Sequence, residues 1–404
     1  MYHHPRRGAS DATGGTRTIR EKLAQRAIGI EQSKIRAVTR RIEAVHGVNL
    51  GQGTCDLPPH PKVLEAARQA ISVGHNSYTL FDGIPSLKQA VADRYRSYNK
   101  IEVQSENILI TGGATGGLEC ICKCFLEPGD EVILFEPIYQ YHVKLIEERG
   151  AVPRFIHLEP PNWEFSLAEM ERQFSARTKL FVFANPNNPC GKVFSLAELE
   201  AIGDSCRSRG VIAVVDEVYE YILGEGSEHI SLASLPRMFP HALTISSASK
   251  TFFVTGWRVG WLVSPEDVID QLGVKSDETY ICAPAPFQYA IADALQLGDE
   301  FFDQLRVPFI RRCEKMCDAL TEAGLVPYVP QGAYYILADY NNLGYSTDIE
   351  AMNALIDKAG VGSIPGSAFF PSKQDTGLLR FCFALTDDLI DRGCELLTQF
   401  PLQK

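Results

Sequence analysis

The stretch Ser246-Ser247-Ala248-Ser249-Lys250-Thr251 follows directly on a short apolar run, residues 242–245. The apolar run predicts a buried strand, so the serines and the lysine lie where that strand ends. A lysine in a serine-rich loop is most often a solvated surface charge. Eight residues later comes Arg258, and its guanidinium, the hydroxyls of Ser247 or Ser249 and the nearby glycines could together hold one phosphate group. The stretch therefore predicts a lysine beside a phosphate site.

Short β-branched runs of this kind alternate with amphipathic stretches from about residue 60 to residue 270. The runs are residues 108–111, 132–135, 180–184, 211–215, 243–246 and 259–263. This alternation is typical of βαβ units around a largely parallel sheet, whose ligand sites gather at the carboxyl ends of the strands. The predicted fold class is α/β.

The pattern changes after about residue 299. A long helical pattern over residues 301–323 precedes a strand-like run at 333–338, a further helix and a second run at 379–384. A chain of 404 residues also exceeds the size of roughly 250–300 residues at which one core stops growing. We therefore expect an N-terminal tail and arm at residues 1–45, a large domain at 46–298 and a smaller α+β domain at 299–404.

Composition and charge argue against several classes of protein. The formal net charge is -11 and there is no basic stripe with interleaved aromatics, so nucleic acid is not an expected partner. No apolar run approaches the roughly 20 residues of a membrane helix, so we expect a soluble protein. The 11 cysteines are scattered, which fits reduced thiols in the cytoplasm. Residues 1–15 lack the apolar core of a secretion signal.

Three of those cysteines, Cys120, Cys122 and Cys124, come nearest to a metal motif. Their Cys-x-Cys-x-Cys order lacks the paired spacing of zinc sites, so the sequence predicts no metal. We interpret the segment as a buried helix with small side chains.

Polar residues follow two other predicted strands. Asp216 begins Asp216-Glu217-Val218-Tyr219, and Asn185 begins Asn185-Pro186-Asn187-Asn188-Pro189. Alone, each would be interpreted as an ordinary turn residue. Beside a lysine and a phosphate site, a carboxylate is what pyridoxal 5'-phosphate (PLP) needs to keep its pyridine nitrogen protonated, and an amide can donate to the ring's phenolate oxygen. These strand ends together predict PLP, with Lys250 as the residue that carries it.

A glycine-rich segment, Thr111-Gly112-Gly113-Ala114-Thr115-Gly116-Gly117, lies between a predicted strand and a predicted helix. Free N–H groups and the dipole at a helix start attract an anion. Close packing or a dinucleotide site would also use glycines here, although the G-x-G-x-x-G spacing is absent.

The motifs, in this order, resemble those of class I and II aminotransferases of PLP fold type I, the fold of aspartate aminotransferase. The resemblance covers about residues 45–395 and rests on residues 247–260, 185–189 and 216–219. Within the family, the sequence is most similar to the kynurenine, glutamine-K and methionine aminotransferase branch. The residues that carry this are Asn49-Leu50-Gly51-Gln52-Gly53, Pro58-Pro59 and Leu379-Arg380-Phe381-Cys382-Phe383.

The resemblance implies a set of cofactor contacts. Lys250 would form the Schiff base and move the substrate's proton, Asp216 would pair with the ring nitrogen, and Tyr139 would stack on the ring. Asn185 and Tyr219 would hold the ring oxygen. The expected phosphate ligands are Ser247, Arg258, Gly113 and Ala114.

The resemblance also implies a substrate site and a homodimer. Arg380 would pair with the substrate α-carboxylate near the backbone of Gly53, and Tyr78 would reach the phosphate in the neighbouring subunit. Without the resemblance, Tyr139 and Tyr78 could equally be half-buried core aromatics, and Arg380 a rim arginine.

The expected activity is transfer of an amino group from a neutral, polar, sulfur-containing or aromatic L-amino acid to a 2-oxo acid, by a ping-pong mechanism. The alternative is a fold-type-I lyase or synthase, such as a C–S β-lyase or an aminocyclopropane-carboxylate synthase, because the cofactor motifs are shared. A PLP-binding regulator would need a DNA-binding module, for which residues 1–45 leave no room.

Three features depart from the kynurenine branch. Thr115 stands where that branch commonly has an aromatic, residues 21–50 contain no Phe, Trp or Tyr, and Phe253 replaces a small residue. The first two predict a roomier or more polar pocket, which favours a neutral or polar donor over a classical aromatic one.

Overall fold

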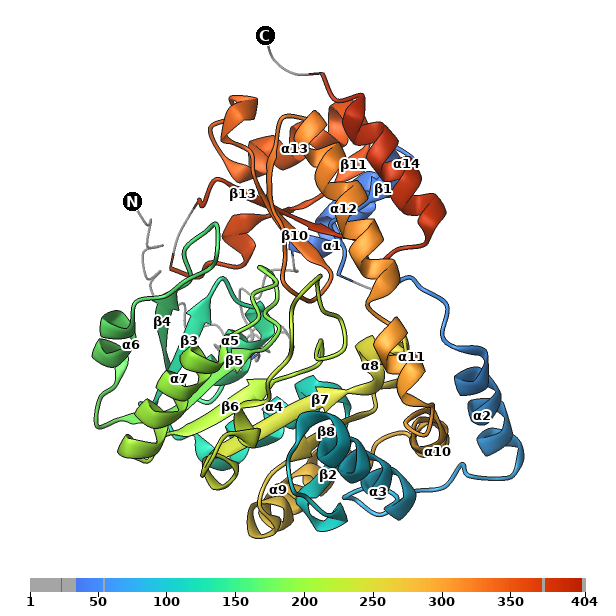
Figure 1. Cartoon of the computed structure of the whole chain (residues 1–404), viewed down its shortest axis with the longest axis vertical. Helices are drawn as coiled ribbons and strands as arrows, with labels where there is room; N and C mark the ends of the chain where they lie inside the picture. Colours follow the sequence, from blue (N-terminus) through green and yellow to red (C-terminus); the bar gives the residue numbers. More distant parts are fainter. Residues whose placement is uncertain (1–22, 24–33, 54, 373–374, 402–404) are drawn as a thin grey trace, which may run out of the picture.

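The computed structural model describes residue 23 and residues 34–53, 55–372 and 375–401. Figure 1 shows a lower part built around one large sheet and an upper part that carries a smaller sheet with α12, α13 and α14. Of the predicted tail and arm, residues 1–45, the described part is residue 23 and residues 34–45.

The large sheet has seven strands in the order β2-β8-β7-β6-β5-β3-β4. Strands β4, β3, β5, β6 and β7 run parallel, and β8 is antiparallel to both β7 and β2. The bounds are β2 Ile108–Thr111, β3 Glu131–Glu136, β4 Val152–His157, β5 Thr178–Ala184, β6 Ile212–Asp216, β7 Ala242–Ser247 and β8 Gly260–Val263. The prediction of an α/β fold with a largely parallel sheet is confirmed.

All six predicted strands are present, and the sequence missed only β4 among the strands of this sheet. Strand β4 lies at the edge, and its burial is incomplete, with Val152 exposed. Because one side of an edge strand is less buried, its sequence VPRFIH shows no continuous apolar run.

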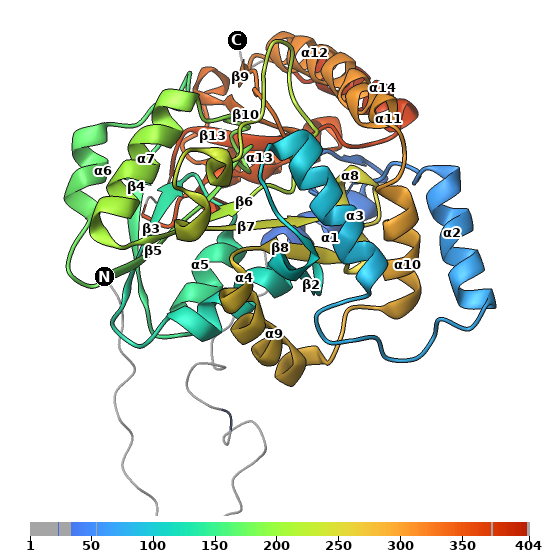
Figure 2. The ribbon, with the colours of Figure 1, turned by 60° about the horizontal axis from the view of Figure 1, so that its bottom comes forward.

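Helices cover both faces of the sheet. Successive residues point to opposite faces, so Leu134 joins the core beneath α4, α5 and α9, whereas Phe135 joins the core beneath α6 and α7. Figure 2 shows α4, α5 and α9 together below the sheet. The bounds are α3 Pro85–Arg94, α4 Gly113–Phe125, α5 Gln140–Glu147, α6 Leu167–Gln173, α7 Leu196–Arg209 and α9 Glu266–Tyr280.

The prediction that the glycine-rich segment lies between a strand and a helix needs correction. The turn between β2 and α4 is Gly112 alone, and Gly113–Gly117 already belong to the helix. Close packing explains glycine at that point, since a Cβ on Gly117 would lie 3.3 Å from the Ile245 side chain. The cysteine helix is α4 itself, with Cys120 and Cys122 buried and Cys124 exposed.

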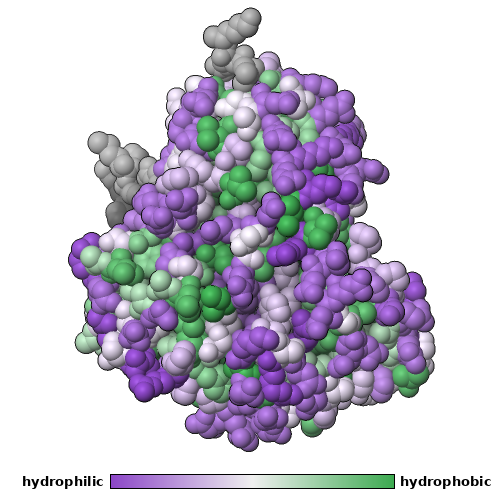
Figure 3. Space-filling view, viewed as in Figure 1, coloured by the Kyte–Doolittle hydropathy of each residue, from purple (hydrophilic) through white to green (hydrophobic). Residues whose placement is uncertain are grey.

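The smaller sheet has the order β12-β13-β10-β9 and packs against α12 and α13, while α14 packs on these two helices. The bounds are α12 Val307–Glu322, β9 Val326–Tyr328, β10 Tyr335–Asp339, α13 Asp348–Ala359, β12 Ile364–Pro365, β13 Leu378–Cys382 and α14 Asp387–Thr398. Both strand-like runs of the sequence correspond to strands here. The outer surfaces of α12 and α14 are mainly hydrophilic on the face seen in Figure 3.

The single helix predicted over residues 301–323 is wrong. The chain forms α11 Asp299–Gln304 and then α12 from Val307. Pro308 accounts for the break, because proline lacks an N–H and its ring clashes with the preceding turn. It is tolerated in the first turn of α12.

The N-terminal part of the described chain packs with its C-terminal part. Helix α1 Lys34–Ala44 leads into β1 Val48–Asn49, which pairs in parallel with β11 Val361–Gly362. Val48 N donates to Gly360 O over 2.8 Å. Residues 34–49 therefore pack with the part of the molecule that contains the smaller sheet. The domain limits at residues 46 and 299 stay predictions.

Two further helices flank the large sheet, α2 Pro61–Ser72 and α10 Ala285–Ala294, and they pack on each other. Within residues 34–53, 55–372 and 375–401, no helix is both long and apolar enough to cross a membrane.

Candidate active site

The site lies where three parallel strands end side by side. Strands β5, β6 and β7 are adjacent, and their last residues are Ala184, Asp216 and Ser247. Asn185 follows β5 and its N–H donates to the Asp216 carbonyl over 3.0 Å. The sheet register thus brings the three predicted strand ends together, as expected for a parallel α/β sheet.

Lys250 follows β7 in the short helix α8 Ala248–Thr251. Its Nζ lies 5.8 Å from the ring centre of Tyr219 and 5.6 Å from that of Tyr334. Burial lowers the pKa of Lys250; the nearby Asp216 carboxylate opposes this effect and Arg258 adds to it. The amine is thus held in an environment that favours its neutral, nucleophilic form.

Asp216 is oriented by a residue that the sequence analysis missed. His142 Nε2, on α5, lies 3.1 Å from Asp216 Oδ2, and Val218 N donates to Asp216 Oδ1 over 3.3 Å. His142 is buried, and its ring meets that of Tyr139 edge to face. The only sequence signal was its place three residues after Tyr139, one helical turn away on the same face.

Arg258 and the start of α4 form a compact anion cradle. Arg258 adopts φ 55°, and its guanidinium donates to Gly112 O over 3.1 Å, to Thr255 O over 2.9 Å and to Ser249 Oγ over 3.5 Å. Gly113 has φ 75°, and any Cβ on it would collide with that guanidinium. The first N–H groups of α4 have no partner within the helix, so they are available to an anion beside Arg258.

Tyr280, at the end of α9, closes this cradle and was also missed. Its hydroxyl accepts from Gly112 N over 2.9 Å and from Ser276 Oγ over 2.8 Å. Ser247 is the N-cap of α8, where its hydroxyl accepts from Ser249 N.

Asn185 is fixed by two hydrogen bonds of its own side chain. Its Oδ1 accepts from Phe194 N and its Nδ2 donates to Ile230 O, both over 3.1 Å. One amide N–H therefore remains for another acceptor. Asn185 is completely buried, so that N–H has a fixed direction.

Tyr219, after β6, lies in a group of three buried tyrosines. Its Oη is 3.1 Å from Tyr335 Oη, and Tyr335 Oη donates to Gly53 O over 3.3 Å. Tyr334 Oη lies 3.5 Å from the same carbonyl. Burial raises the pKa of Tyr219 well above its ordinary range, so its hydroxyl stays protonated and can donate.

Arg380 on β13 is almost fully buried, with 2% of its surface exposed. Its Nη2 donates to Gly51 O over 2.8 Å, whereas Nε has no partner among the described atoms. Its guanidinium carbon lies 4.3 Å from the ring centre of Tyr335 and 4.5 Å from that of Phe369. A buried cation without a carboxylate partner is costly, which indicates a site for an anionic ligand.

Tyr139 is the N-cap residue of α5 and is half-buried. Burial raises the pKa of its phenol, and the charges of Asp216 and Arg380 also act on it. The carboxylate at the end of β6 and the arginine of β13 are therefore both near enough to Tyr139 to act on its charge.

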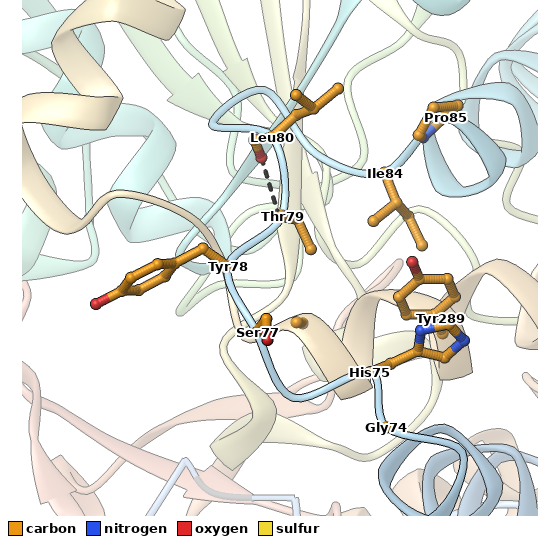
Figure 4. A pocket seen from close by; sticks show the side chains of 10 residues that line it. Gly74, His75, Ser77, Tyr78, Thr79, Leu80, Ile84, Pro85 and Tyr289 are labelled. Carbon is orange, nitrogen blue, oxygen red and sulfur yellow. Dashed lines mark hydrogen bonds between the residues drawn. The ribbon is translucent and has the colours of Figure 1, made fainter.

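Tyr78 is the one predicted site residue that stands apart. Its side chain is 78% exposed, and Figure 4 shows it directed away from His75 and Tyr289, which stack on each other. It borders a surface pocket of about 270 Å³ that is lined by the connection between α2 and α3 and by α10. Within its own chain, none of the described contacts joins Tyr78 to the strand ends.

A second buried polar group lies behind the strand ends. One ligand-type atom each of Glu217, Glu220 and His229 lies within 4.8 Å of the others, a spacing that would suit a metal ion. Protons bound to these side chains would also balance the negative charge of the two glutamates. Burial raises the pKa of Glu220 to about 7; burial also disfavours a charged His229, but the Glu217 carboxylate outweighs this and raises the pKa of the imidazole.

The fold and the grouping of side chains define a class: an α/β enzyme with a partly buried lysine near a carboxylate and an anion cradle. The chain belongs to the aminotransferase class I and II family, whose model matches residues 45–397. It is therefore a transaminase by family.

Individual relatives agree with this assignment. Kynurenine–oxoglutarate transaminase 3 of Rattus norvegicus is 33% identical, over 97% of this chain and 93% of the relative. The solved structure of N-succinyldiaminopimelate aminotransferase from Mycobacterium tuberculosis is 32% identical, with a TM-score of 0.89 over 94% of this chain and 100% of that one. Aspartate aminotransferase from Thermus thermophilus is 29% identical, with a TM-score of 0.87 over 94% and 99%.

Two predictions are confirmed by these comparisons. The fold is that of the aspartate aminotransferase group, and the activity class is amino-acid transamination, near the kynurenine transaminase branch. The lyase or synthase alternative is not favoured, because the three relatives are all aminotransferases.

Proposed function

We propose that the chain is a PLP-dependent aminotransferase in which Lys250 binds the cofactor covalently. The observation that carries the proposal is the Lys250 amine, whose pKa is lowered by burial and which lies near enough to Asp216 and Arg258 for both charges to act on it. A lysine of this kind matches the requirements for a Schiff base, which forms from a neutral amine.

The residues fit PLP at each of its polar groups. The Arg258 cradle and the free N–H groups of Gly113 and Ala114 suit a phosphate, and Gly113 leaves no side chain in its way. Asp216, held by His142, suits a protonated pyridine nitrogen. The remaining amide N–H of Asn185 and the hydroxyl of Tyr219 suit the ring oxygen, while Tyr139 suits a stacked position.

When bound, PLP supplies an electron sink for the carbon that loses its proton. The side chains of the protein would supply the base, the partner of the ring nitrogen and the site for the substrate carboxylate. Lys250 would be the base that moves the α-proton, and burial, which lowers its pKa, favours the neutral form that this task needs. The Asp216 carboxylate would keep the ring nitrogen protonated, and Arg380 would hold the substrate carboxylate through paired hydrogen bonds.

The amino donor is proposed to be a neutral or polar L-amino acid, with a 2-oxo acid as acceptor. The names of the relatives above refer to kynurenine, N-succinyldiaminopimelate and aspartate. These substrates differ too widely to indicate one amino donor for this chain. Thr115 is exposed on the first turn of α4, where a small polar side chain leaves room. A donor profile with strict preference for aspartate would contradict this proposal.

We also propose a cytoplasmic homodimer. Tyr78 is highly exposed, and the same connection between α2 and α3 exposes Val73 and Leu80 at 62% each. Exposed apolar side chains gathered on one loop support an interface with a second copy. Light scattering of purified protein would test the dimer, and a monomeric, fully active enzyme would contradict it. The cytoplasmic setting rests on the scattered free thiols.

The first experiment is an absorbance titration of the purified protein with PLP, between about 320 and 430 nm, as amino acids are added without an acceptor. Conversion of the cofactor to its amine form by a suitable donor is expected, because transamination stores the amino group on the cofactor. A stable cofactor band with release of pyruvate or ammonia would point to elimination. No cofactor band at all would overturn the proposal.

A further inference from the structure

Tyr335 is placed by the small sheet on the same face as Arg380. In the antiparallel pair β10–β13, Tyr335 is opposite Cys382 and Leu337 is opposite Arg380. Residues opposite each other, and those two positions along, share one face of a sheet. Tyr335 and Arg380 are therefore diagonal neighbours on the face that meets the strand ends of the large sheet.

The hydroxyl of Tyr335 has partners on both sides of the site, besides a hydrogen bond with Tyr334. It lies 3.1 Å from Tyr219 Oη and 3.3 Å from the carbonyl oxygen of Gly53. A hydroxyl has one proton and two lone pairs, so it can donate to only one of them at a time. Tyr334 Oη lies 3.5 Å from the same carbonyl and is a second donor for it.

The ring of Tyr335 supports the guanidinium of Arg380. The ring centre of Tyr335 is 4.3 Å from the guanidinium carbon, and the ring centre of Phe369 is 4.5 Å from it. Stacking between two rings fixes the plane of a guanidinium, which decides whether it can form a paired contact with a carboxylate. A Cβ on Gly53 would lie 2.6 Å from Tyr335 Oη, so this ring also determines how close the Gly53 backbone comes.

We propose that Tyr335 is a positioning residue that couples the cofactor side of the site to the carboxylate side. This inference rests on the proposed function. When Tyr219 donates its proton to an anionic oxygen, its own oxygen is free to accept, and Tyr335 is the donor at 3.1 Å. Donation along such a chain strengthens the bond that Tyr219 makes. The ring of Tyr335 orients Arg380. Tyr335 therefore acts on the cofactor side through its hydroxyl and on the carboxylate side through its ring.

The test separates the hydroxyl from the ring. Tyr335→Phe removes only the hydroxyl, and Phe369→Leu is the matched control that removes one stacking ring without touching Tyr219. The first readout is the pH midpoint of the visible band of each protein–cofactor complex. The second is the pair of steady-state constants, kcat and KM, for the fastest donor of the wild type.

For Tyr335→Phe we expect the midpoint to rise by about 0.3–1 pH unit, because the anionic ring oxygen that accompanies the deprotonated state loses support. Its KM should stay within about twofold of the wild type, since the ring remains. For Phe369→Leu we expect an unchanged midpoint and a KM raised roughly fivefold or more.

A midpoint for Tyr335→Phe that is unchanged or lower would overturn the inference, as would equal changes of midpoint and KM in both variants. A merely structural role for Tyr335 predicts that second pattern. If the wild type itself forms no visible band with PLP, the proposed function fails before any variant is compared, so the two failures are distinguishable.

Discussion

The two halves of the site are built in different ways. The proposed cofactor side is centred on neighbouring strands of one sheet, where the backbone register of β5, β6 and β7 brings Asn185, Asp216 and Ser247 together. The proposed substrate side brings together Gly53, Tyr335 and Arg380, which come from distant parts of the chain. The cofactor side therefore depends on local strand order, and the substrate side on how the small sheet packs against the large one. Substitutions on the two sides should accordingly change different kinetic constants.

The largest effect is expected on the cofactor side, from Lys250→Ala. Loss of the amine removes both the covalent anchor and the base, so kcat should fall by about 10³-fold or more. The exposed Lys275, paired with Glu278 on α9, is the matched control, and Lys275→Ala should keep wild-type activity. Activity of Lys250→Ala within tenfold of the wild type would contradict the assignment.

The next effect separates Asp216 from the residue that orients it. Asp216→Asn removes the negative charge, and kcat should fall by about 10²-fold or more. His142→Asn leaves that charge but loses the 3.1 Å contact, so a fall of roughly tenfold is expected. Steady-state kinetics would check both, and an equal or larger loss for His142→Asn would show that the histidine does more than orient.

On the substrate side, Arg380→Lys should act mainly on KM. A lysine keeps the charge but loses the forked geometry and the stacking between Tyr335 and Phe369, so KM should rise about 10- to 100-fold. Arg392→Lys, at an exposed arginine that bonds to His46 O, is the control. A pure loss of kcat in Arg380→Lys would break the division between the two halves.

The smallest effect concerns stability and comes from Glu220 behind the strand ends. Burial raises the pKa of Glu220 to about 7, above its ordinary value in the unfolded chain. The folded protein therefore binds this proton more tightly. Its contribution to stability is complete below about pH 4.5 and is lost as the pH rises through 7, by an amount of order 1–3 kcal/mol.

The glutamine of Glu220→Gln cannot titrate. The free energy of unfolding of the variant should therefore increase relative to that of the wild type as the pH rises from 5 to 8. Denaturant unfolding at several pH values measures this difference. Parallel curves for the two proteins would mean that Glu220 does not change its protonation in this range.

The difference between the two halves also explains what the sequence could predict. Apolar runs that end in Asn185, Asp216 and Ser247 give both the strands and the site, because strand order in a parallel sheet fixes where those ends meet. His142 and Tyr280 lie on helices, and only packing brings them to Asp216 and Gly112. Tyr335 gave no signal, since its partners Tyr219 and Gly53 are distant in the chain. The missed edge strand β4 and the break at Pro308 depend on local burial and on one proline.

The most direct measurement of the central claim is chemical. Reduction of the PLP-loaded wild-type protein with borohydride makes the lysine–cofactor bond permanent, and peptide mass spectrometry then locates the added mass. We expect that mass on the peptide containing Lys250 and on no other lysine at comparable occupancy. Modification spread over exposed lysines, or found elsewhere while Lys250 stays free, would contradict the account.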